Sequence, residues 1–84
     1  MNKIIVYSTL ICPYCNAAKN LLNSLDLAYE EVRIDLDPEQ RALMMKKSGR
    51  TSVPQIFIND HHVGGFDDLS ALHRAGKLGE LLNR

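Results

Sequence analysis

The residues most able to do chemistry are two cysteines in the segment Cys12-Pro13-Tyr14-Cys15. Pro13 suits the first position of a helix, and an apolar stripe follows it, so we expect the pair at a helix start. This spacing puts both sulfurs on one face, where a disulfide can close. The free amides and dipole of a helix start favour an anion, so we expect a lowered pKa for Cys12, the nucleophile. Cys15, one turn further on, would later release a partner from a mixed disulfide.

The same spacing also occurs as half of a structural zinc site. Such a site needs two more ligands, and His61, His62 and His73 are available, although their spacing matches no usual zinc-finger pattern. Two ordinary half-buried cysteines are a further alternative. Pro13 and the helix start favour thiol–disulfide chemistry over both, and we expect no metal.

Two further segments have a plain interpretation and a functional one. Val53-Pro54 precedes an apolar run. Pro54 either begins a strand, or forms a cis peptide that presents backbone groups toward the cysteines. Gly64-Gly65-Phe66-Asp67-Asp68 is either a turn with ordinary helix capping, or an anion pocket with close backbone approach and free helix amides. Asp67 could then pair with an ammonium, which would suit an amino-acid-like ligand. The residues alone leave these alternatives open.

The elements that position these segments follow from apolar periodicity and capping residues. We expect one domain over residues 1–84. A βαβ unit makes the first two strands parallel, and a hairpin turning at Asn59-Asp60 adds an antiparallel pair. The predicted fold class is α/β, a four-stranded mixed sheet in the order β-α-β-α-β-β-α, flanked by helices. The expected strands are Ile4–Tyr7, Tyr29–Ile34, Gln55–Ile58 and His61–Val63, and the expected helices are Pro13–Leu25, Pro38–Ser48 and Asp67 to near Gly76, with a short helical segment at Leu78–Leu82.

The composition narrows the class of protein. Ten basic and ten acidic residues cancel, which gives no electrostatic footprint for nucleic acid or an acidic membrane. No apolar stretch is long enough for a signal peptide or a membrane span, so the expected compartment is the cytoplasm. In a reducing compartment, a lone close cysteine pair is better explained by chemistry than by scaffolding.

Taken together, the three segments resemble the glutaredoxin family over nearly the whole chain, and most of all the small bacterial dithiol members of the glutaredoxin 3 type. The resemblance implies a thioredoxin-like fold. It also implies reduction of protein disulfides and glutathione mixed disulfides, with glutathione as reducing co-substrate and no permanently bound cofactor. Cys12 would be the nucleophile and Cys15 the resolving thiol. The Val53–Pro54 bond would be cis, and contacts to glutathione would come from Thr9, Tyr14, Ser52, Val53, Pro54, Phe66 and Asp67.

Thr9 departs from the family pattern, because many members carry a Lys three residues before the first cysteine. Thr9 can donate a hydrogen bond but brings no charge to favour the thiolate. Lys19 and Arg41 are candidate substitutes. The resemblance implies glutathionylated or disulfide-containing protein partners, with ribonucleotide reductase among the family expectations, and we expect a monomer. Two alternatives remain: a redoxin reduced by thioredoxin reductase, and a carrier whose Cys12 holds an iron–sulfur cluster with glutathione between two subunits. Pro13-Tyr14 tends to disfavour the carrier.

Overall fold

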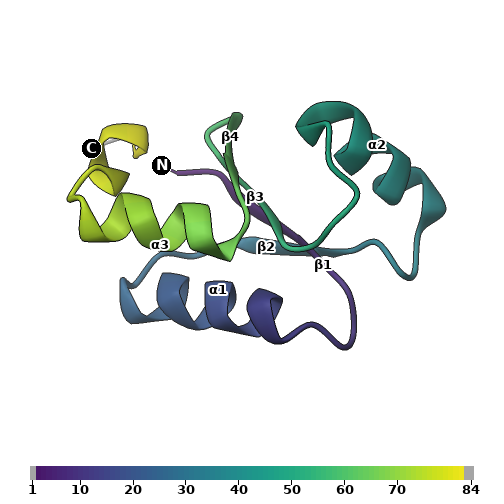
Figure 1. The fold of residues 1–84 in the computed structure, drawn as a ribbon, viewed down its shortest axis with the longest axis horizontal. Coiled ribbons are helices and arrows are strands. Elements are labelled where there is room, and N and C mark those ends of the chain that lie inside the picture. The colour runs from purple at the N-terminus through teal and green to yellow at the C-terminus, as the bar shows by residue number, and fades with distance from the viewer. Residues whose placement is uncertain (1, 83–84) are drawn as a thin grey trace.

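A computed structural model describes residues 2–82 as one four-stranded sheet with helices on both faces (Figure 1). Helices α1 and α3 cover one face, and α2 lies on the other. The predicted order and sheet class are confirmed. The elements are β1 Ile4–Ser8, α1 Pro13–Ser24, β2 Glu30–Arg33, α2 Pro38–Ser48, β3 Gln55–Ile58, β4 His61–Gly64, α3 Phe66–Arg74 and a final 3₁₀ helix, η1, Leu78–Leu81.

The sheet runs in the order β2-β1-β3-β4. Strand β1 is parallel to β2 and antiparallel to β3, and β3 is antiparallel to β4. Asn59 and Asp60 have φ values of 51° and 69°, the left-handed conformations that a two-residue hairpin turn requires. Tyr7, near the end of β1, lies opposite Gln55 at the start of β3. The loops that carry Cys12 and Pro54 therefore emerge at the same end of the sheet.

Two apolar clusters lie on opposite faces of the sheet, because alternate residues of each strand face opposite ways. The larger one packs β1 and β3 against α1, α3 and η1, and the smaller one packs them against α2. Both clusters pack on the central strand β1, which leads into the cysteine loop. The buried members are Ile4, Val6, Ala18, Leu22, Ile56, Ile58, Leu69 and Leu78 in the first cluster, and Tyr7, Ile34, Met44 and Phe57 in the second.

The boundaries of β2, β4 and α3 differ from the prediction, and the ends of β1, α1 and η1 each differ by one residue. Strand β2 is shorter than expected, since Tyr29 and Ile34 flank the Glu30–Arg33 ladder. Gly64, expected to break the chain, is the last residue of β4 and pairs with Ile56. Helix α3 begins at Phe66, before the expected Asp67, and ends at Arg74. Within residues 2–82, no helix is long and apolar enough to cross a bilayer.

Candidate active site

Cys12 and Cys15 are joined by a disulfide at the start of α1, with their Cα atoms 5.2 Å apart. Cys12 is the N-cap residue, with an extended φ of −152°, and Pro13 follows at the first helical position. The Cys12 Sγ accepts a hydrogen bond from the Cys15 backbone N–H at 3.1 Å. Cys12 is 8% exposed, whereas Cys15 is fully buried. An incoming thiolate or disulfide therefore meets Cys12 first, at an end of the helix that stabilises negative charge.

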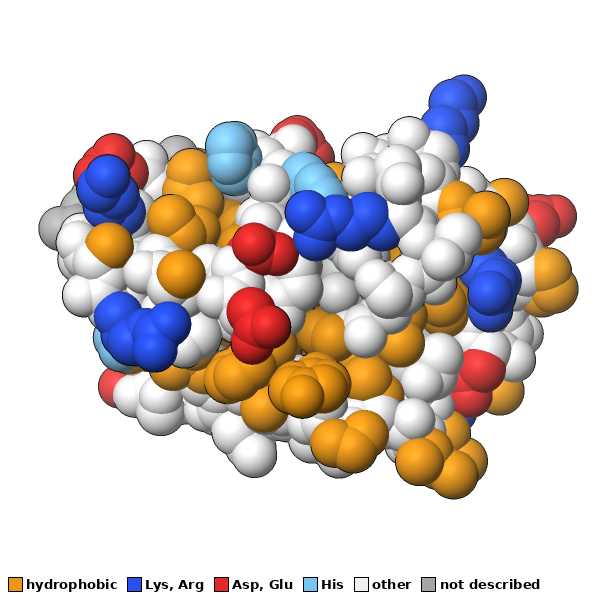
Figure 2. Space-filling view, viewed as in Figure 1, with side chains coloured by type: hydrophobic (Ala, Val, Ile, Leu, Met, Phe, Trp, Pro, Cys, Tyr) orange, Lys and Arg blue, Asp and Glu red, His pale blue; other side chains and the backbone are white. Residues whose placement is uncertain are grey.

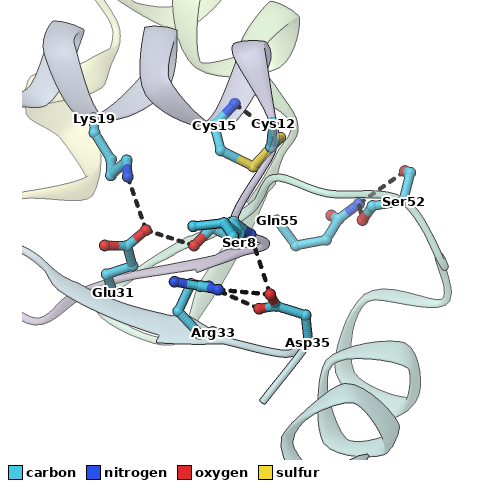
Figure 3. The surroundings of a disulfide bond; sticks show 10 residues. Ser8, Cys12, Cys15, Lys19, Glu31, Arg33, Asp35, Ser52 and Gln55 are labelled. Atoms are coloured by element: carbon cyan, nitrogen blue, oxygen red, sulfur yellow. Dashed lines mark hydrogen bonds and ion pairs between the residues drawn. A yellow bond between two sulfur atoms is a disulfide. The ribbon is translucent and has the colours of Figure 1, made fainter. Parts of the chain in front are cut away.

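A polar network ties α1 to strand β2 beside the disulfide (Figure 3). Glu31 accepts hydrogen bonds from the buried Ser8 hydroxyl at 2.6 Å and from Lys19 Nζ at 2.8 Å. The Lys19 hydrogen bond, followed by that of Ser8, lowers the pKa of Glu31. Lys19 was a candidate substitute for the missing Lys at position 9, and it is paired with Glu31. Arg41, the other candidate, lies exposed on α2.

A second ion pair anchors the loop that leads to Cys12. Arg33 donates two hydrogen bonds to Asp35, at 2.7 and 2.6 Å, and the Asp35 carboxylate accepts the Leu10 backbone N–H at 3.3 Å. The Arg33 hydrogen bond is the main reason that the pKa of Asp35 falls to about 2. At neutral pH the ionised Asp35 therefore connects the end of β2 to Leu10, in the loop before Cys12.

An open pocket of about 210 Å³ adjoins Tyr14 of the cysteine motif. The Val53–Pro54 peptide bond in its wall is cis. The Tyr14 and Phe66 rings both line it and stack on each other, with centroids 6.4 Å apart. A larger hollow, of about 340 Å³, lies between Lys3, Lys47 and Phe57, away from the cysteines. The residues that line the smaller pocket are Tyr14, Arg50, Ser52, Val53, Pro54, Gln55, Gly65, Phe66, Asp67 and Asp68.

The structure brings together most of the residues predicted to contact a ligand. Six of them line this pocket: Tyr14, Ser52, Val53, Pro54, Phe66 and Asp67. Among the described residues, Thr9 is the predicted contact that does not line it, since it lies in the loop between β1 and α1. Residues 2–82 contain no group of three or more His, Cys, Asp or Glu placed to hold a metal ion.

Four residues of the pocket wall were not among the predicted glutathione contacts: Arg50, Gln55, Gly65 and Asp68. Gly65 and Asp68 belong to the segment that the sequence singled out as a possible anion pocket, whereas Arg50 and Gln55 were given no role. Arg50 and Asp68 form an ion pair. Arg50 Nη1 lies 3.2 Å from the Asp68 carboxylate, and both side chains are about half exposed. Asp68 also accepts the Gly65 backbone N–H at 2.9 Å, and this bond is the main reason that its pKa is lowered. Asp68 lies three residues after the helix cap and therefore confirms the capping interpretation of this segment. Nothing in the local sequence singles out Arg50.

Comparison with known proteins assigns the chain to a family. A family model described as Glutaredoxin matches residues 4–63. The chain belongs to the glutaredoxin family. With its Cys12–Cys15 pair, this member of the family is a thiol–disulfide oxidoreductase.

Similar proteins and structures agree with this assignment. The chain is 49% identical to a glutaredoxin of Pseudomonas aeruginosa over 83 residues, covering 99% of each chain. It is 48% identical to glutaredoxin 3 of Escherichia coli over 82 residues, covering 98% of this chain and 99% of that one. A buckwheat glutaredoxin–glutathione complex superposes with a TM-score of 0.87 at 32% identity, over 96% of this chain and 76% of the other. Its fold, like that of the other matched glutaredoxins, is thioredoxin-like.

Proposed function

We propose that this glutaredoxin is a glutathione-dependent reductase of glutathionylated proteins and protein disulfides. The observation that carries the proposal is a disulfide at a helix start, next to a pocket walled by Val53–Pro54 on one side and Phe66–Asp67 on the other. The similar buckwheat protein was solved in complex with glutathione, which supports the same ligand here. The reaction consumes reduced glutathione, so we infer that it takes place in the cytoplasm.

The pocket offers complementary groups along the length of a tripeptide. The backbone of Val53 would pair with the cysteinyl residue of glutathione, which brings the ligand sulfur toward Cys12. The γ-glutamyl end carries both a carboxylate and an ammonium. The first-turn amides of α3 would bind the carboxylate, and Asp67 the ammonium. Tyr14 and Phe66 would cover the apolar stem of the ligand.

Removal of glutathione from a protein begins when the Cys12 thiolate attacks the glutathione sulfur of the mixed disulfide. A bond forms between Cys12 and glutathione, and the protein sulfur leaves as a thiolate that takes a proton from water. A second glutathione, as thiolate, then attacks the glutathione sulfur held on Cys12. Glutathione disulfide leaves, and the Cys12 thiolate returns.

Reduction of a protein disulfide requires both Cys12 and Cys15. Cys12 attacks one sulfur of the disulfide, forms a mixed disulfide with the protein and frees the other protein sulfur. Cys15 then attacks Cys12, which releases the second protein thiol and leaves Cys12–Cys15 oxidised. Two glutathione molecules supply the two electrons that reduce it: the first opens the bond by attacking Cys12, and the second removes that glutathione as glutathione disulfide.

Two serine variants test these roles, assayed with glutathione and a reductase for glutathione disulfide. Cys15→Ser should keep activity on a mixed disulfide of glutathione and cysteine, and should lose activity on a protein disulfide. Cys12→Ser should lose both activities. Substantial turnover by Cys12→Ser, or reduction of the wild type by thioredoxin reductase rather than by glutathione, would refute the proposal.

A further inference from the structure

The side chain of Gln55 is a buried amide directly after the cis-proline, and it is only 1% exposed. Its Nε2 donates to the Ser52 carbonyl oxygen at 3.0 Å and lies 3.4 Å from the Ser52 hydroxyl. Its Oε1 lies 2.8 Å from His62 Nε2 on strand β4. Figure 3 shows the Gln55 side chain reaching the Ser52 end of the loop. One side chain thus joins the pocket loop to the edge of the sheet.

The direction of these hydrogen bonds is fixed by the Ser52 carbonyl, which can only accept. The NH₂ end of Gln55 must therefore face Ser52, which leaves Oε1 as an acceptor toward His62. His62 must then carry a proton on Nε2, whether its ring is neutral or charged. Burial is the main cause of a lowered pKa at His62. The ring is held in turn by packing on Phe57, with centroids 4.9 Å apart.

The loop that Gln55 holds has little other hydrogen-bonded support. Outside the helices and strands of residues 2–82, no backbone–backbone hydrogen bond reaches residues 51–54. The same loop supplies Ser52, Val53 and Pro54 to the pocket beside the disulfide. Its conformation near Ser52 therefore depends on the Gln55 amide. His62, which the sequence offered only as an available zinc ligand, is half-buried and anchors this amide.

We propose that Gln55 and His62 act as a pair of positioning residues, which hold the Ser52–Pro54 loop in the conformation that binds the substrate. Neither residue needs to touch the reacting sulfurs. This inference rests on the proposed glutathione-dependent activity only where it is tested by kinetics. If the amide is lost, the loop spends part of its time in other conformations, and the apparent affinity falls in proportion to the competent fraction.

The test compares Gln55→Leu, which removes both hydrogen bonds, with His62→Phe, which keeps a ring over Phe57 and removes the donor. The substrate is the mixed disulfide of glutathione and cysteine. We expect KM to rise roughly three- to tenfold in each variant, with kcat changed less than about twofold. Since the two residues act as one unit, the double variant should show about the same KM as Gln55→Leu alone. Gln40→Leu, the same chemical change on α2, is the matched control and should leave KM unchanged.

Two further measurements separate positioning from a general loss of structure. The alkylation rate of reduced Cys12 by iodoacetamide, which needs no pocket, should stay at the wild-type value in every variant. Backbone ¹⁵N relaxation should show order parameters at residues 51–53 that fall in Gln55→Leu. The inference would be overturned if KM were unchanged in Gln55→Leu. It would also be overturned if the increase in KM of the double variant equalled the product of the two single increases. If the wild type fails to use glutathione, the proposed function fails, and the relaxation data alone decide: unchanged order at residues 51–53 would overturn the positioning role.

Discussion

Replacement of Gly64 by alanine should destabilise this protein much more than the same change at Gly76. Gly64 has φ +116°, where a side chain is strained, which costs about 1–3 kcal/mol. Its new Cβ would also collide with the Asp68 carboxylate, 2.8 Å from Asp68 Cγ, and would lie 3.2 Å from Arg50 Nη1. Displacing Asp68 breaks its hydrogen bond to the Gly65 amide, a cap worth about 1 kcal/mol. The sum is about 2–4 kcal/mol of the free energy of unfolding.

Gly76 provides the control, because its φ is +71° and a Cβ there meets nothing within 4 Å. Gly76→Ala should therefore cost only the backbone strain, about 1–2 kcal/mol. Urea unfolding gives both free energies, and the melting temperature of Gly64→Ala should fall by roughly 8 °C or more. In an Asp68→Ala background the collision disappears, so Gly64→Ala should cost less there than in the wild type. Equal costs at Gly64 and Gly76, or equal costs in both backgrounds, would refute the steric argument.

Three other predictions follow from named contacts. The pKa of Asp35 is about 2 in the folded protein, below its ordinary value of 3.8, so its contribution to stability is complete above about pH 4 and is lost as the pH falls toward 2. The melting temperature of Asp35→Asn should therefore fall less than that of the wild type as the pH is lowered from about 4 to about 2. Asp37→Ala removes the cap that accepts the Glu39 amide at 3.0 Å and should cost about 1 kcal/mol in urea unfolding, without changing activity. Lys19→Met should raise the pKa of Glu31, measured by NMR titration of its carboxyl carbon, because it removes the largest cause of the lowering.

Local chemistry explains why much of the fold could be predicted. The limits of α2 follow from Asp37, Pro38 and Gly49, because these residue types are favoured at the N-cap, at the first position and just past the end of a helix. The hairpin likewise follows from Asn59-Asp60, two residues that tolerate left-handed backbone. The disulfide between Cys12 and Cys15 could be predicted from their spacing at a helix start alone.

Contacts between distant segments could not be predicted in this way. The Arg50–Asp68 ion pair joins residues 18 positions apart, and His62 reaches Gln55 only because β3 and β4 are paired. The hydrogen bond from the Leu10 amide, beside Thr9, to the Asp35 carboxylate likewise joins residues 25 positions apart. Such partners depend on the register of the sheet, which the local sequence does not state.

The position of β2 at the border of the sheet has a consequence for self-association. An uncovered border strand exposes unpaired backbone groups to which a second chain can add. Three of the four residues of β2 are charged, Glu30, Glu31 and Arg33, so this strand offers a copy of itself little apolar surface. On the face shown in Figure 2, apolar side chains gather near the first turn of α1 and the loop before it. Glu31 and Arg33 also make the ion pairs beside the disulfide. Substitutions that neutralise them would therefore weaken the cysteine loop and remove a barrier to aggregation at the same time.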